Sequence, residues 1–137
     1  MTKELWINLP VKDLKKSKEF FTALEFSFTS KYGDTDYSAC LIVGTKNIAV
    51  MLFEENMFKG FTQNNLTDTK QSTEVLFSID AESKAEVDTM AMKVEAAGGI
   101  VFSKPADNQG WMYGCAFSDL DGHRWNILHM DMSKMPK

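Results

Sequence analysis

Short stretches of alternating apolar and polar residues, typical of half-buried β-strands, precede two helical patterns in this chain. The first, residues 5–9, reads Leu-Trp-Ile-Asn-Leu. Pro10 ends this strand, and Asp13 is placed to cap the helix that follows. Apolar residues at helical spacing then predict a helix over 14–24. Further strands are expected at 26–32, 37–43 and 48–53.

The same order of elements returns in the second half of the chain. A strand is expected at 73–79, and Ser83 with Glu86 forms a capping box for a helix that ends at Gly98. The strands expected after this helix are 100–103, 112–118 and 124–129, with a loop at 105–110. The predicted fold class is α+β: two β-α-β-β-β modules that form a curved, cup-like mixed sheet with helices on its outer face.

We expect a single domain over 1–137, with modules at about 4–53 and 73–130 and a linker at 54–72. The linker is polar, with Met57, Phe58 and Phe61 embedded in it. It is longer than most connections, and long ordered loops are often lids or binding loops. The interpretation we favour is a linker whose aromatic residues pack on the nearest surface.

Alternation divides the expected strands into two faces. The first is almost wholly apolar and should lie under the helices; it holds Leu5, Ile7, Leu9, Ile48, Val50, Leu52, Val75, Phe77, Ile79, Trp125, Ile127 and His129. The second mixes large apolar groups with isolated polar ones: Trp6, Asn8, Ala49, Met51, Phe53, Glu74, Leu76, Ser78, Arg124, Asn126 and Leu128. Apolar walls with a few polar groups favour a small-molecule site on this second face.

Composition narrows the classes of partner. The net charge of −4 and the lack of basic clusters beside exposed aromatic residues argue against nucleic acid. No apolar run approaches the ~20 residues that cross a membrane. Cys40 and Cys115 lie in separate strands and are expected to be reduced core thiols. Because the N-terminus also lacks a signal pattern, we expect a cytoplasmic protein.

Two motifs resemble the vicinal oxygen chelate superfamily, which includes glyoxalase I, extradiol dioxygenases and bleomycin resistance proteins. The first is NLPVKDLKKSKEFFTALEF, similar to the family's opening strand and helix; Glu25 stands where the family usually has glycine. The second is FSDLDGHRWNIL, similar to the family's closing D-P-D-G turn and strand. Together they cover nearly the whole chain, and the PhnB-like branch looks most similar. The resemblance implies a homodimer.

Active members of that superfamily bind a divalent metal at positions that correspond here to Trp6, Met51, Glu74 and Asn126. Indole nitrogen has no free lone pair, thioether sulfur is a soft ligand, and an amide oxygen is a weak one. Glu74 alone is a good ligand, so we expect no metal and no other cofactor. Glu74 has an alternative role as an ion-pair partner of Arg124. No glycine-rich loop supports nucleotide binding or methyltransferase chemistry.

The leading hypothesis is a metal-free module that binds a small apolar or aromatic molecule. Its expected pocket residues are Trp6, Asn8, Met51, Phe53, Glu74, Arg124 and Asn126. The first alternative is a divalent-metal-dependent lyase or dioxygenase with a shifted ligand set, such as Glu74 with Glu54 or Glu55 and a histidine. The second alternative is a structural or interaction role, with the cup filled by its own side chains.

Overall fold

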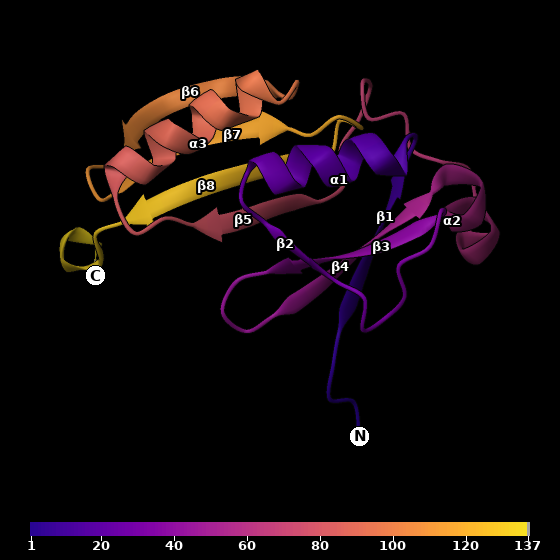
Figure 1. Ribbon diagram of the computed structural model, residues 1–137. Coiled ribbons are helices and arrows are strands. Elements are labelled where there is room, and N and C mark those ends of the chain that lie inside the picture. The colour runs from indigo at the N-terminus through magenta and orange to yellow at the C-terminus, as the bar shows by residue number, and fades with distance from the viewer. Residues whose placement is uncertain (137) are drawn as a thin grey trace. The chain divides into compact units, whose positions relative to one another are not determined.

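A computed structural model describes residues 1–136, and the chain divides into two compact units, Met1–Asp68 and Thr69–Lys137. Each unit contains a four-stranded mixed sheet (Figure 1). Each sheet is built from one β-α-β-β-β sequence of elements. The predicted α+β class and its repeated module are therefore confirmed, and neither sheet closes into a barrel.

The first unit opens with strand β1 (Trp6–Val11), which leads into helix α1 (Leu14–Ala23). The expected cap forms, because the Asp13 carboxylate accepts a hydrogen bond from the Lys16 backbone N–H at 3.1 Å. Three strands follow: β2 (Ser27–Thr29), β3 (Ser38–Val43) and β4 (Ile48–Glu54). Their order in the sheet is β1-β4-β3-β2, with β1 parallel to β4 and the other pairs antiparallel.

The second unit repeats this order with β5 (Leu76–Asp80), α3 (Lys84–Ala96), β6 (Ile100–Asn108), β7 (Met112–Ser118) and β8 (Arg124–Met130). A short 3₁₀ turn, η1 (Met132–Lys134), follows β8. The sheet order is β5-β8-β7-β6, with β5 parallel to β8. Helix α3 runs along β6 and β7 in Figure 1. Val87 and Ala91 of this helix share a buried cluster with Cys115 and Ile127 of the sheet.

The capping box of α3 forms with one change. The Ser83 hydroxyl accepts from the Glu86 N–H at 3.1 Å, as predicted. The Glu86 carboxylate, however, accepts from the N–H of Glu82 at 2.7 Å, one residue before the cap.

The segment predicted as a linker contains a helix. Helix α2 (Glu55–Thr62) begins where the Glu54 carboxylate accepts from the Asn56 N–H at 3.1 Å, and it ends at Gln63, which is left-handed with φ of 54°. Phe61 of this helix meets Phe53 of β4 edge to face, with ring centroids 5.0 Å apart. The polar composition of 54–72 concealed this two-turn helix, which has only one side that packs.

Three strand boundaries also differ from the prediction. β2 is shorter than 26–32, and β6 continues through Pro105 to Asn108, because register shifts between Val101 and Ala106 accommodate the proline. β5 begins at Leu76. The expected burial of Leu5, Ile48 and Val75 is wrong; they lie at or beyond strand ends and are 73%, 44% and 52% exposed.

A buried carboxylate organises the turn between β7 and β8. Asp119 accepts hydrogen bonds from the backbone N–H groups of Asp121 and His123, both at 3.0 Å, and from the Trp125 indole N–H at 3.1 Å. Burial raises the pKa of the Asp119 carboxyl, while the His123 charge and these hydrogen bonds act to lower the pKa. Trp125 itself is buried between Phe77 and Phe117.

Among residues 1–136, no helix is both long and apolar enough to span a membrane.

The Asp119→Asn variant is expected to lower the free energy of unfolding by about 1–3 kcal/mol. An amide retains an oxygen for the two backbone donors, but its NH₂ group then faces the Trp125 N–H, donor against donor. Urea denaturation measures the change. Asp36→Asn, at an exposed position, is the matched control and should change stability by less than about 0.5 kcal/mol. Equal stability of the two variants would contradict this role for Asp119.

Candidate functional site

Four predicted pocket residues lie on one face of the first unit's sheet. Strand register pairs Asn8 with Met51 and Pro10 with Phe53, and places Trp6 beside Ala49. Met51 is buried in a cluster with Cys40 and Ala49, and Phe53 packs against that cluster. Trp6 is 44% exposed and meets Tyr32 edge to face, with centroids 5.5 Å apart. This face therefore carries an accessible aromatic pair beside a filled apolar cluster.

In the second unit, the predicted Arg124 and Asn126 share a face of β8 with Leu128, because side chains alternate along a strand. This is the face opposite α3, since Cys115 and Ile127 of the intervening positions pack against that helix. Register brings small residues of β7 onto the same face, with Gly114 paired to Leu128 and Ala116 paired to Asn126.

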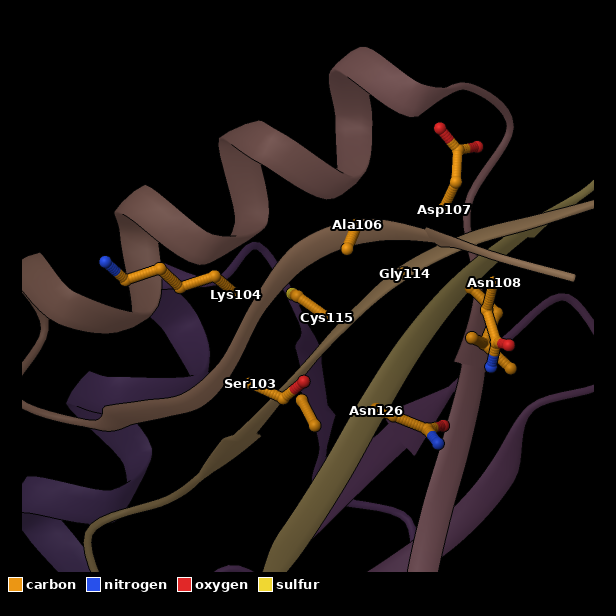
Figure 2. Close-up of a pocket in the computed structure, with 10 residues that line it drawn as sticks. Ser103, Lys104, Ala106, Asp107, Asn108, Gly114, Cys115 and Asn126 are labelled. Atoms are coloured by element: carbon orange, nitrogen blue, oxygen red, sulfur yellow. The ribbon is translucent and has the colours of Figure 1, made fainter. Parts of the chain in front are cut away.

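A pocket of about 330 Å³ opens over this face. Its lining residues are Ser103, Lys104, Ala106, Asp107, Asn108, Gly114, Cys115, Ala116, Asn126 and Leu128. Figure 2 shows Asn108 and Asn126 on one side of the sheet, while the side chains of Lys104 and Asp107 are directed away from them. Asp107 instead forms an ion pair with Lys84 of α3 at 3.3 Å. The pocket side chains are therefore small or neutral, with two amides among them.

Gly114 keeps the floor of this pocket low. A Cβ at this position would lie 2.5 Å from Leu128 Cδ2 and 2.7 Å from the Ile127 carbonyl oxygen. The leucine side chain has freedom to move, but the backbone carbonyl belongs to the neighbouring strand and does not. Glycine is thus required for the close approach of β7 to β8.

Two polar atoms on this face are buried without a hydrogen-bond partner in the described part of the chain: Asn126 Oδ1 and Arg124 Nε. The Arg124 guanidinium lies over the Phe102 ring, 4.2 Å from its centroid. An unsatisfied buried polar atom costs about 1–3 kcal/mol, so such atoms usually have a partner, which can be a water molecule or a ligand. A third such atom, Trp111 Nε1, lines a separate hollow of about 60 Å³.

Glu74 does not join Arg124. It is exposed and lies two residues before β5, since that strand begins at Leu76. Across residues 1–136 no ion pair links Glu74 to Arg124, whose guanidinium packs on Phe102 instead. The alternative role of Glu74 as an ion-pair partner is therefore wrong. Glu74 also lies outside the pocket lining.

The residues at the superfamily's metal positions do not fit a divalent ion. Trp6 offers no lone pair, Met51 offers a buried thioether, and Asn126 a neutral amide. Within 1–136 no three His, Cys, Asp or Glu side chains come together in a way that could hold a metal. In the shifted set, the Glu54 carboxylate already caps α2 and His129 Nδ1 lies 3.1 Å from the Ala81 carbonyl oxygen.

Both cysteines are free thiols and buried, which confirms the expectation of reduced core residues. Burial raises the pKa of Cys115 to about 11, with a smaller contribution from the Asp88 charge, and burial also raises the pKa of Cys40. Neither thiol is therefore ionised at neutral pH, and neither is suited to act as a nucleophile.

Only one of the ten lining residues of the pocket, Asn126, was among the predicted pocket residues, and the other nine were missed. In β6, Ala106, Asp107 and Asn108 were missed because residues 105–110 were expected to form a loop. A signal was present in β7, where small Gly114, Ala116 and Ser118 alternate with bulkier Tyr113, Cys115 and Phe117. Small residues at every second position of a central strand leave a hollow on that face.

Comparison with models of protein families identifies the superfamily to which the chain belongs. Residues 5–127 match the model of the Glyoxalase/Bleomycin resistance protein/Dioxygenase superfamily. The chain belongs to this superfamily. The match confirms the resemblance inferred from the two sequence motifs at the level of the superfamily, although the PhnB-like branch remains a prediction.

Several solved structures share the fold of this chain. A hypothetical protein from S. aureus is 36% identical, with a TM-score of 0.84 over 94% of this chain and 95% of its own. A superfamily enzyme from Burkholderia phytofirmans is 14% identical (TM-score 0.77, 92% and 97% covered), and a fosfomycin resistance protein from Listeria monocytogenes is 20% identical (0.66, 98% of each chain). The last two show the fold alone. No curated protein matches the chain.

The Gly114→Ala variant is expected to lower the free energy of unfolding by about 1–3 kcal/mol, because the added methyl group meets a backbone carbonyl. Gly60→Ala is the matched control: nothing lies within 4 Å of its added Cβ, and in helix α2 it should stabilise by about 0.5–1 kcal/mol. Thermal or urea unfolding compares the two variants. A Gly114→Ala protein as stable as the wild type would show that β7 and β8 do not need this close approach.

Proposed function

We propose that the protein is a metal-independent small-molecule-binding member of the superfamily. The observation that carries the proposal is the pocket of about 330 Å³, floored by small residues, into whose lining Asn126 brings a buried oxygen with no partner. A hollow of this volume lies at the lower end of the range for ligand pockets. An orienting polar atom is suited to binding in a hollow whose charged lining side chains, Lys104 and Asp107, are directed away from it.

The ligand we propose is small and partly apolar or aromatic. The low floor at Gly114 and Ala116 admits a flat apolar group, and Asn126 supplies a hydrogen-bond acceptor. In the first unit, Trp6 and Tyr32 form an exposed aromatic pair that offers a second surface for such a group. Asn8 and Phe53 lie on the same face and extend that surface, while Met51 is buried in the adjoining apolar cluster.

The main alternative is a divalent-metal-dependent lyase or dioxygenase, as the superfamily's name suggests. The donor chemistry at Trp6, Met51 and Asn126 disfavours it, and Glu74 lies outside the strand that would carry the third ligand position. The other alternative, an interior filled by its own side chains, describes the cluster around Met51 in the first unit but not the second unit, where the pocket is open. We further propose that both units act as one domain, 1–137, in a cytoplasmic homodimer of the PhnB-like branch.

The test combines metal analysis with binding by the Asn126→Ala variant. Protein purified without a metal-affinity tag and incubated with Mn²⁺, Fe²⁺, Ni²⁺ or Zn²⁺ should retain less than stoichiometric metal by mass spectrometry. Chelator-treated protein should still bind members of a panel of small aromatic acids, amides and alcohols, followed by tryptophan fluorescence. The variant should bind about tenfold more weakly, because a buried hydrogen bond is lost.

Stability distinguishes a binding role of Asn126 from a structural one. Because Asn126 Oδ1 has no partner in the described chain, its removal should leave the melting temperature unchanged or raise it. Asn64→Ala, in an exposed loop, controls for loss of an asparagine and should not alter binding. Stoichiometric metal that is required for binding, and lost in Glu74→Ala, would contradict the proposal and favour the metalloenzyme.

A further inference from the structure

Arg124 differs from every other cationic residue of the chain. It is the only arginine among fifteen lysine and arginine residues. It is partly buried, and it lies on the pocket face of β8, two residues before Asn126. The other fourteen of these residues are lysines. The single guanidinium of the chain therefore lies close, along the same strand, to Asn126, an amide of the pocket lining.

The environment of Arg124 leaves one of its donors, Nε, without a hydrogen-bond partner. Its guanidinium carbon lies 4.2 Å from the centroid of the Phe102 ring, and Phe102 directly precedes Ser103 of the pocket lining. The Nε atom is buried without a partner, and no acidic side chain of residues 1–136 forms an ion pair with Arg124. A guanidinium that packs on a ring keeps its N–H donors in its own plane, free for a ligand.

Charge and geometry indicate which group would satisfy Arg124. An unpaired, partly buried cation is costly, and a planar fork of N–H donors fits a carboxylate with two parallel hydrogen bonds. Asn126 Oδ1, on the same face, requires an N–H donor. Side chains two residues apart on a strand are about 7 Å apart at their origins, so one small ligand can reach both.

Building on the proposed function, we infer that the ligand is a small carboxylate that also carries an N–H donor and an apolar group, as in an N-acyl amino acid. Its carboxylate binds the Arg124 guanidinium, its amide N–H donates to Asn126 Oδ1, and its apolar group lies over Gly114 and Ala116. Asn126 of the pocket lining and Arg124, two residues before it on the same face of β8, are thereby the specificity-determining residues.

Three matched probes test this inference on the wild-type protein by calorimetry after chelator treatment. N-Benzoylglycine carries the carboxylate, the N–H and an aromatic ring; its methyl ester lacks the charge; 3-benzoylpropanoate replaces the N–H with CH₂. The acid should bind at least about tenfold more tightly than the ester, since hydrogen bonds to a charged group are the stronger kind. It should also bind about three- to tenfold more tightly than the CH₂ analogue.

Single substitutions test which residue causes the preference for the acid over the ester and which causes the preference for the N–H over the CH₂ analogue. Arg124→Met retains an apolar stem over Phe102, so the protein should keep its fold and its ester affinity but lose the preference for the acid. Arg124→Lys should keep only part of that preference, because it retains the charge without the fork. Lys46→Gln removes a charge from an exposed turn of the first unit, outside the pocket lining, and it should retain the full preference. Asn126→Ala should lose only the N–H preference.

Equal affinity for acid and ester in the wild type would overturn the inference and leave the proposed function standing. A preference for the acid that persists in Arg124→Met would also overturn it. Displacement of the acid by an equal concentration of inorganic phosphate, but not by acetate, would assign the anion to phosphate and overturn the carboxylate. Binding that requires added metal would instead contradict the proposed function, and no binding by any probe, charged or neutral, would contradict both.

Discussion

The structure of the second unit depends on two features of β8. Hydrogen bonds fix the start of this strand, and its side chains alternate between the two faces of the sheet. Asp119 accepts three hydrogen bonds, one of them from the Trp125 indole, and Trp125 is buried between two phenylalanines. Once Trp125 and Ile127 are committed to the buried side, Arg124, Asn126 and Leu128 must lie on the opposite face. A shift of one residue would exchange these sets, placing a guanidinium and an amide in an apolar core at prohibitive cost.

The neighbouring strand turns that polar face into a binding surface. In β7 the bulky Cys115 and Phe117 pack on the buried side, while Gly114 and Ala116 leave space beside Asn126 and Leu128. The resulting pocket contains two neutral amides, and the lining side chains of Lys104 and Asp107 are directed away from them. Selective binding is the property that such an arrangement supports, whereas the metal chemistry of the superfamily would need donors that Trp6 and Met51 do not provide.

Much of the fold was predictable from local signals, because strands and helices here carry clear alternation and capping residues. The helix caps at Asp13 and Ser83 and the turn at D-L-D-G form as predicted. The prediction that Arg124 and Asn126 share the sheet face opposite the helix is also correct. Helix α2 was not predicted, since it is short and lies in a segment, 54–72, that is polar as a whole. Glu74 was assigned to the pocket because β5 was expected three residues too early, and the β6 lining was missed because register shifts carry the strand past Pro105. Strand ends and bulges depend on partners distant in sequence, which local patterns do not record.

Whether the β6–β8 face of the second unit binds a small molecule without metal can be measured by NMR. Amide chemical shifts of ¹⁵N-labelled, chelator-treated protein are followed during titration with N-benzoylglycine. We expect saturable shifts at the backbone amides of Ser103, Asn108 and Gly114 and at the side-chain NH₂ of Asn126, with little change along α3. Shifts that appear only after a divalent metal is added, or that fall outside this face, would rule out metal-free binding at this site.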